Sequence, residues 1–135
     1  MDIASTAYIV DDDSIYVYSI KKLIGLRSFC NQVISFPNGA DALQALKDAN
    51  LSGLGMPQII LLDINMPIMD GWDFLHEFEK LQPTLSAEVI IYMVSSSPDD
   101  RDVKRAMETG LVKNYMAKPM TLSRLAEIFG DPIAA

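Results

Sequence analysis

Short hydrophobic runs alternate along this chain with segments whose apolar residues recur at helical spacing. The most informative run is 59–62, four consecutive aliphatic residues followed directly by Asp63. An unbroken apolar run of this kind is typical of a strand buried on both faces in the middle of a parallel sheet. Pro67 stops a regular strand, and Asp70-Gly71 favours a turn. We therefore expect a central strand that ends on a carboxylate.

Five such runs predict strands, and the amphipathic segment after each run predicts a helix. The predicted strands are 7–10, 32–36, 59–63, 88–94 and 114–117. The predicted helices begin at Asp13 or Ser14, after Gly39, after Gly71, at Ser97-Pro98, and at Thr121 or Ser123. This alternation indicates an α/β fold, a doubly wound parallel sheet with right-handed crossovers and helices on both faces. Residues 1–135 show no linker or repeat and are expected to form a single domain.

Turn-forming and apolar residues set the expected limits and faces of the helices. Ser97-Pro98 supplies a capping serine and a proline at the first helical position. Gly110 is expected to cap the other end of the same helix. Residues 50–57 contain two glycines and a proline and predict a loop after the second helix. Tyr16 is expected on the apolar face of the first helix.

Composition and charge narrow the classes of function. A chain of 135 residues can bury a core without disulfides or structural metals. The formal net charge of -7 and the absence of a basic run disfavour direct contact with nucleic acid. No apolar run is long enough to cross a bilayer, so we expect no membrane insertion. The single cysteine, Cys30, fits a reducing compartment, and a cytoplasmic location is expected.

Polar side chains follow four of the five predicted strands. Asp11 and Asp12 follow the first strand, and Asp63 ends the third. Ser95 follows the fourth strand and Lys118 the fifth. Because the carboxyl ends of parallel strands lie on one edge of the sheet, we expect these residues to converge. Three carboxylates repel one another unless a cation joins them. Hard oxygen ligands without histidine or cysteine point to Mg²⁺, or to Mn²⁺ in the same ligand set.

A magnesium site of this kind suits phosphoryl transfer with a carboxylate nucleophile, which gives an aspartyl phosphate. Asp63 is the best candidate because it stands alone on the central strand, whereas Asp11 and Asp12 are paired for metal binding. Lys118 and the Ser95 hydroxyl could hold phosphoryl oxygens as a charged and a neutral donor. Each residue taken alone could serve only as a helix cap or a surface charge. Their combination is what indicates a site.

These motifs resemble those of the receiver domains of two-component response regulators, the CheY-like family. The resemblance covers nearly the whole chain. It rests on Asp11-Asp12, on Asp63 followed by Met66-Pro67 and Asp70-Gly71, on Ser95, and on Lys118-Pro119. It implies a flavodoxin-like sheet with strand order 2-1-3-4-5, an order that periodicity does not reveal. After Lys118-Pro119 the sequence predicts one short helix, so we expect a stand-alone phosphorelay protein without an output domain.

The resemblance further implies roles for the residues at the predicted site. Asp63 would accept the phosphoryl group from a histidine kinase or a histidine phosphotransfer protein. Asp12, Asp63 and the backbone carbonyl of Asn65 would bind Mg²⁺, with Asp11 acting through water. Asn65 and Ser97 would tune dephosphorylation.

Other residues would transmit the signal. Ser95 would move towards the phosphoryl group and Tyr115 would change rotamer with it. The resulting change would reach a protein effector through the face formed by the fourth helix, the fifth strand and the fifth helix. The peptide bond between Lys118 and Pro119 would be cis and would aim Lys118.

Two other functions stay open at this point. One is a phosphatase-like enzyme that works through an aspartyl phosphate and usually needs a second acid two residues after the nucleophile. This chain has Asn65 there, which cannot act as a general acid. We therefore expect no enzyme activity beyond self-phosphorylation and slow autodephosphorylation. The other is an interaction module that never uses phosphate, against which the full set of acids, serine and lysine argues. Asp13, an extra acid, and the long loop at 50–57 depart from the family pattern.

Overall fold

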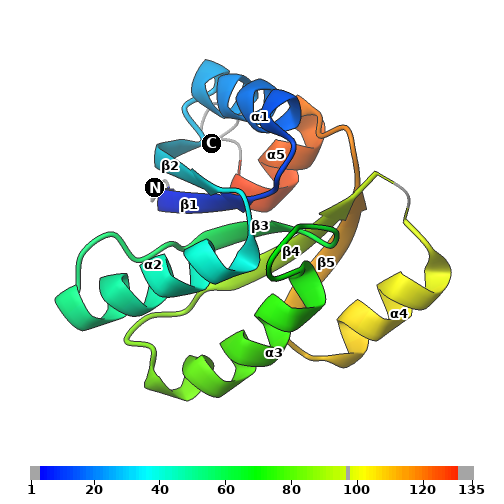
Figure 1. Cartoon of the computed structure of the whole chain (residues 1–135). Coiled ribbons are helices and arrows are strands. Elements are labelled where there is room, and N and C mark those ends of the chain that lie inside the picture. Colours follow the sequence, from blue (N-terminus) through cyan, green and yellow to red (C-terminus); the bar gives the residue numbers. More distant parts are fainter. Residues whose placement is uncertain (1–3, 97, 131–135) are drawn as a thin grey trace.

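The computed structural model describes residues 4–96 and 98–130. Five parallel strands form one sheet in the order β2-β1-β3-β4-β5, with helices on both faces (Figure 1). The strands are β1 (Ala4–Val10), β2 (Cys30–Phe36), β3 (Ile59–Asp63), β4 (Ile90–Ser95) and β5 (Val112–Ala117). The helices are α1 (Ser14–Leu26), α2 (Gly39–Ser52), α3 (Gly71–Leu81), the 3-10 turn η1 (Gln82–Thr84), α4 (Asp100–Glu108) and α5 (Leu122–Phe129). The α/β class and the flavodoxin-like strand order are confirmed. No described helix has the length and hydrophobicity that a membrane span requires.

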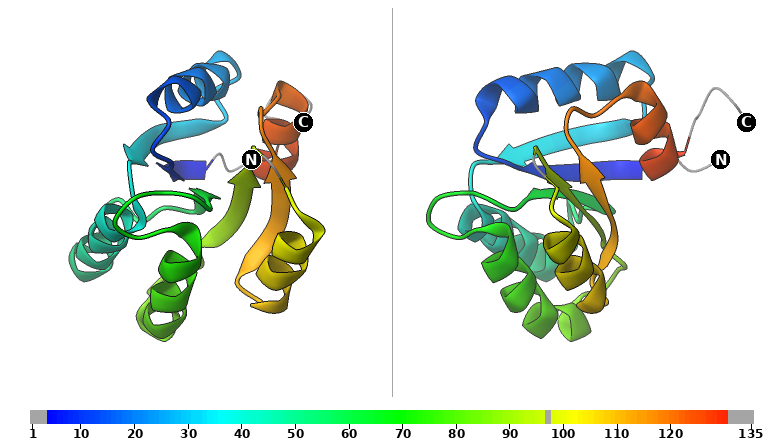
Figure 2. Two further views of the ribbon diagram at one scale, coloured as in Figure 1. Left: turned by 45° about the vertical axis from the view of Figure 1, so that its right-hand side comes forward. Right: turned by 90° about the vertical axis from the view of Figure 1, so that its right-hand side faces the viewer.

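The central strand contributes to two separate hydrophobic cores because its side chains alternate between the two faces of the sheet. Ile60 and Leu62 of β3 belong to the core that includes residues of α2 and α3. Ile59 and Leu61 belong to the core that includes residues of α1 and α5. Figure 2 shows these two groups of helices on opposite sides of the sheet. Both faces of β3 are therefore covered, which explains why its sequence is apolar without alternation.

The same alternation directs two carboxylates towards the layer of α1 and α5. Asp11 lies two residues beyond Ile9, and Asp63 lies two residues beyond Leu61. Both Ile9 and Leu61 pack in the core of α1 and α5. Because side chains two residues apart in a strand share a face, Asp11 and Asp63 lean towards the same side of the sheet edge. The register of β1 with β3 places these two strand ends side by side.

Helix α2 is longer than the sequence indicated. It continues into the segment 50–57 and ends at Gly53, whose φ of 74° is the left-handed cap conformation. The predicted loop was therefore wrong in its first three residues. The side-chain amide of Asn50 donates to the carbonyl of Thr84 and accepts from the N–H of Ser86. These long-range hydrogen bonds hold the last turn of α2 in a helical conformation that local turn signals did not predict.

Helix α4 begins later than the sequence indicated and is largely exposed. Its N-cap is Asp99, whose carboxylate accepts a 2.7 Å hydrogen bond from the N–H of Arg101. The start predicted at Ser97-Pro98 was therefore wrong, and Ser97 itself lies outside the described residues. Among the residues of α4, Ala106 is the one that is fully buried.

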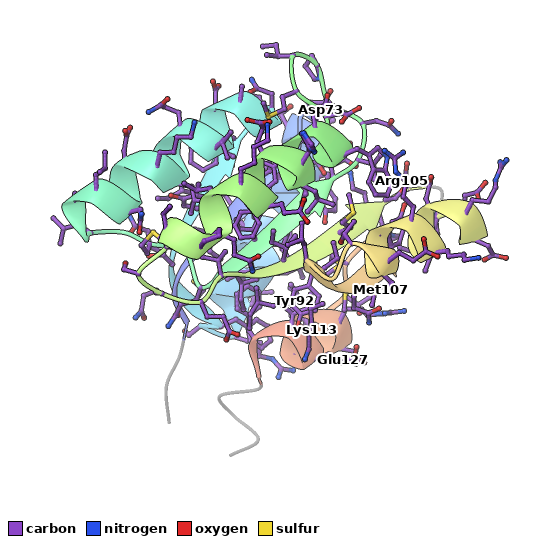
Figure 3. All side chains as sticks on the ribbon, turned by 90° about the horizontal axis from the view of Figure 1, so that it is seen from below. Asp73, Tyr92, Arg105, Met107, Lys113 and Glu127 are labelled. Carbon is purple, nitrogen blue, oxygen red and sulfur yellow. The ribbon has the colours of Figure 1, made fainter. Side chains whose placement is uncertain are left out.

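A side-chain contact links α4 to α3. The guanidinium of Arg105 lies over the ring of Trp72, 4.1 Å from the ring centroid. In Figure 3, Arg105 lies on the side of α4 that faces α3. Such a cation–π contact holds the two helices together without burying much apolar surface.

Gly71 begins α3 directly against the end of β3. Its N–H donates to the carbonyl of Ile64 at 2.8 Å. A Cβ added to Gly71 would lie 2.5 Å from the backbone oxygen of Asp63. Because backbone cannot rotate away, we expect Gly71→Ala to lower the free energy of unfolding by about 1–3 kcal/mol. Urea denaturation measures this change. Gly25→Ala in α1, where nothing lies within 4 Å of the added Cβ, is the control and should be neutral or slightly stabilising. Equal effects of the two substitutions would contradict the steric argument.

Candidate functional site

Three aspartates gather at the carboxyl edge of the sheet. Asp63 ends β3, Asp11 and Asp12 follow β1, and the three offer carboxylate oxygens that all lie within 4.8 Å of one another. Asp11 and Asp63 are 5% and 9% exposed, whereas Asp12 is open to solvent. Over residues 4–96 and 98–130, this is the one group of three or more acidic, histidine or cysteine side chains close enough to share a metal ion.

Lys118 places its ammonium group among these carboxylates. Its Nζ lies 2.6 Å from Oδ2 of Asp11 and 3.7 Å from Oδ1 of Asp63. The backbone N–H of Lys118 donates to the carbonyl of Ser95 at 2.8 Å, which fixes the residue beside the end of β4. The Lys118–Pro119 peptide bond is cis, as the resemblance implied. One ammonium faces three carboxylates, so the cluster keeps a negative charge.

The pKa of Asp63 is raised to about 6. Burial is the largest cause, and the charge of Asp11 is the second. Lys118 and a backbone hydrogen bond at Ile64 lower the pKa and offset only part of the rise. The ammonium of Lys118 lies closer to Asp11 than to Asp63, which explains why Asp63 is incompletely compensated.

The donor set and its charge fit a magnesium ion. All three side chains offer hard carboxylate oxygens, the ligands that Mg²⁺ prefers. A carboxylate whose charge is unfavourable in the metal-free protein gains stability from a cation placed beside it. The exposure of Asp12 leaves the cluster open to solvent on one side, so an ion can enter and keep several of its waters.

Ser95 and Tyr115 lie at the neighbouring strand ends. Ser95 is 5% exposed at the end of β4, and Tyr115 is 8% exposed on β5. The Tyr115 hydroxyl is buried and has no hydrogen bond of regular geometry among the described residues. Burial raises the pKa of Tyr115, and an interaction with Ser95 partly offsets the rise. These two hydroxyls are therefore neighbours. Asn65 is exposed in the loop after β3.

Sequence reasoning missed Tyr16 as a residue of the site. Asp13, noted only as an extra acid or a cap, accepts hydrogen bonds of 3.1 Å from the N–H groups of Ile15 and Tyr16 and caps α1. The ring of Tyr16 then lies against Lys118, whose Nζ is 4.2 Å from the ring centroid. A signal was available, because side chains in a helix lean towards its N-terminus. An aromatic residue in the first turn after Asp12 therefore leans back towards the strand ends.

Comparison with known proteins agrees with this geometry. Residues 7–129 match the family model of the response regulator receiver domain. The chain is 32% identical over 123 residues to Two-component response regulator 24 of Arabidopsis thaliana, which covers 91% of this chain and 80% of that protein. It is 31% identical over 111 residues to protein-glutamate methylesterase/protein-glutamine glutaminase 3 of Burkholderia thailandensis. That match covers 82% of this chain but only 28% of the methylesterase, so most of the enzyme has no counterpart here.

A solved structure shows the same fold. The crystal structure of a two component response regulator from Cytophaga hutchinsonii superposes with a TM-score of 0.87 at 27% identity. The superposition covers 99% of this chain and 100% of that chain. This chain therefore belongs to the receiver domains of two-component response regulators.

Proposed function

We propose that this protein is a phosphoacceptor of two-component signalling and that Asp63 takes the phosphoryl group. The observation that carries the proposal is the cluster itself. A nearly buried carboxylate ends the central strand, two further carboxylates lie within 4.8 Å, and Lys118 reaches both Asp11 and Asp63. Receiver domains of this family are phosphorylated by histidine kinases and pass signals to effectors, which supports the same assignment.

In the proposed reaction, an Asp63 carboxylate oxygen attacks the phosphorus of a phosphohistidine on the kinase or phosphotransfer protein. An O–P bond forms while the P–N bond breaks, and the electron pair stays on the histidine nitrogen, which takes a proton from solvent. Asp11, Asp12 and Asp63, with the Asn65 carbonyl, would hold Mg²⁺, which neutralises charge on the phosphoryl oxygens.

The remaining predicted residues have proposed roles around the phosphoryl group. Lys118 would donate a charge-assisted hydrogen bond to one phosphoryl oxygen, and the Ser95 hydroxyl would donate to another. Tyr115, the buried neighbour of Ser95, would follow its movement. Asn65 and Ser97 would set the lifetime of the phosphoryl group. No acid stands at Asn65 to drive hydrolysis, so we propose only slow loss of the group.

The output of the proposed switch is the face of α4, β5 and α5, which would meet a protein effector in the cytoplasm. Helix α4 suits this role because it has one fully buried residue, Ala106, and can shift without exposing much apolar surface. The acidic charge of the chain argues against nucleic acid as the direct partner. Residues 1–135 would act as one receiver domain.

Incubation with acetyl phosphate, a small phosphodonor, tests the proposal. With Mg²⁺ present, intact-mass analysis should show the gain of one phosphoryl group per chain. Addition of a chelator should prevent the gain, because the carboxylate cluster then lacks its cation. Digestion and peptide mapping should place the group on the peptide that contains Asp63. A protein that stays unmodified, or that carries the group elsewhere, would overturn the assignment.

A further inference from the structure

Within the described part of the chain, the ammonium group of Lys118 interacts with three side chains of two different kinds. Two are the carboxylates of Asp11 and Asp63, at 2.6 Å and 3.7 Å. The third is the ring of Tyr16, whose centroid lies 4.2 Å from Nζ. The carboxylates are also the groups that would hold a metal ion. The aromatic ring is the neutral member of the three, and its interaction with Lys118 involves no metal ligand.

The start of α1 sets the position of Tyr16. Asp13 caps α1 and accepts a hydrogen bond from the Tyr16 N–H, so the first turn of the helix is fixed beside the site. The Tyr16 hydroxyl is buried and has no hydrogen-bond partner among the described residues. Burial, followed by the charges of Asp11 and Asp63, raises the pKa of Tyr16, so its hydroxyl stays neutral at physiological pH. The face of the ring, rather than a phenolate charge, is what Tyr16 offers to Lys118.

We propose that Tyr16 is a positioning residue for phosphoryl transfer, whose ring keeps the Lys118 ammonium beside Asp63 once the carboxylates share their charge with a divalent cation. The proposal rests on the proposed function of Asp63. A bound cation weakens the attraction between the carboxylates and Lys118 and repels the ammonium. The attraction between the ammonium and the ring quadrupole is unaffected by the loss of carboxylate charge and strengthens where water is excluded. Tyr16 thus keeps Lys118 at the site when Asp11 and Asp63 bind the divalent cation.

Three variants separate this role from a merely structural one. Tyr16→Leu removes the π face, and Tyr16→Phe keeps the ring but removes the hydroxyl. Tyr18→Leu is the matched control on the same helix. The ring of Tyr18 lies 5.3 Å from the Nζ of Lys22, but Tyr18 is 64% exposed, so this second cation–π pair lies largely in water and does not involve Lys118.

The first readout is the phosphorylation rate constant at saturating acetyl phosphate and Mg²⁺. Tyr16→Leu should lower it about tenfold. Tyr16→Phe and Tyr18→Leu should stay within about twofold of wild type. Calorimetric titration should give all variants the Mg²⁺ affinity of wild type within about twofold, because Tyr16 is not a metal ligand. If Tyr16→Leu fails to fold, Tyr16→Met offers a flexible apolar side chain without a π face and should show the same loss.

The second readout needs no phosphorylation. In NMR spectra recorded with Mg²⁺, the ε-methylene protons of Lys118 should be shifted upfield by the ring current in wild type and Tyr16→Phe. This shift should vanish in Tyr16→Leu. If wild type shows the upfield shift but accepts no phosphoryl group, the proposed function of Asp63 is refuted. The contact between Tyr16 and Lys118 would still be supported. If Tyr16→Leu is phosphorylated as fast as wild type, the role of Tyr16 is refuted. The same holds if Mg²⁺ abolishes the upfield shift in wild type. Neither result would affect the proposed function of Asp63.

Discussion

Asp63→Asn is expected to abolish phosphoryl acceptance and to make the metal-free protein more stable at neutral pH. Asparagine keeps the shape of the side chain but has no anionic oxygen with which to attack phosphorus. Burial and the neighbouring charge of Asp11 raise the pKa of Asp63 to about 6, which means that its ionised form is unfavourable in the folded chain. The substitution removes that unfavourable charge, so function and stability should change in opposite directions.

The pH dependence of this gain in stability follows from the raised pKa of Asp63. Between the ordinary value of 3.8 and the folded value of about 6, the folded protein binds a proton at Asp63 more tightly than the unfolded chain does. The resulting stabilisation is fully present below pH 3.8 and is lost as the pH rises through about 6. Asp63→Asn should therefore exceed wild type in the free energy of unfolding by about 3 kcal/mol at pH 7, and the difference should fall below about 1 kcal/mol near pH 4.

Urea denaturation with a chelator at several pH values measures the stability change, and intact-mass analysis with acetyl phosphate measures acceptance. Asp48→Asn is the control, because Asp48 is exposed on α2 and its carboxylate accepts a hydrogen bond from the side-chain amide of Gln44. It should leave both quantities unchanged. Retained phosphorylation in Asp63→Asn would place the acceptor elsewhere. A destabilised Asp63→Asn would show that the negative charge is balanced in the metal-free protein.

Lys118→Met is the second substitution with a large expected effect. Lys118 is the cation that faces Asp11 at 2.6 Å and Asp63 at 3.7 Å, and its side chain is 13% exposed. Methionine has a similar length and can still pack on Tyr16, but it leaves the carboxylates without a positive neighbour. We expect the free energy of unfolding at pH 7 without metal to fall by about 2–4 kcal/mol, and phosphorylation to be lost.

Two conditions should relieve the instability of Lys118→Met. Mg²⁺ replaces the missing positive charge and should bind this variant more tightly than wild type. A lower pH should also narrow the deficit, since protonation of Asp63 removes one of the repelling charges. Thermal denaturation with and without Mg²⁺ measures both effects. Lys113→Met, at an exposed position of β5, is the control and should behave as wild type. A deficit that neither metal nor acid reduces would indicate lost packing instead.

The sequence carried enough information for the elements and for the acidic core of the site. The apolar run 59–62 identified a strand buried on both faces. Asp63 is the first polar residue after that run, so its position at the end of the strand could be predicted. Convergence of Asp11, Asp63 and Lys118 follows from the parallel arrangement alone. Strand order came only through the family resemblance, because periodicity describes each strand separately and does not identify its neighbours in the sheet.

Contacts between distant residues account for what sequence reasoning missed. The end of α2 depends on hydrogen bonds from Asn50 to the segment after η1, which no local pattern encodes. The start of α4 was misplaced for a local reason instead, because Asp99 caps the helix and also pairs with Arg101 two residues further on. Tyr16 was assigned to an apolar face, which is correct for its ring. Its contact with Lys118 depends on tertiary folding that joins the first helix to the last strand.

The contact between Arg105 and Trp72 has a practical consequence. Trp72 is the single tryptophan of the chain, and the guanidinium over its ring belongs to α4. Any displacement of α4 changes the solvent and the charge next to the indole, and thereby its emission. Trp72 is thus an intrinsic fluorescence probe for the position of α4, and no label is needed. Stopped-flow fluorescence can therefore time the movement of α4 directly, on the same sample in which mass analysis counts phosphoryl groups.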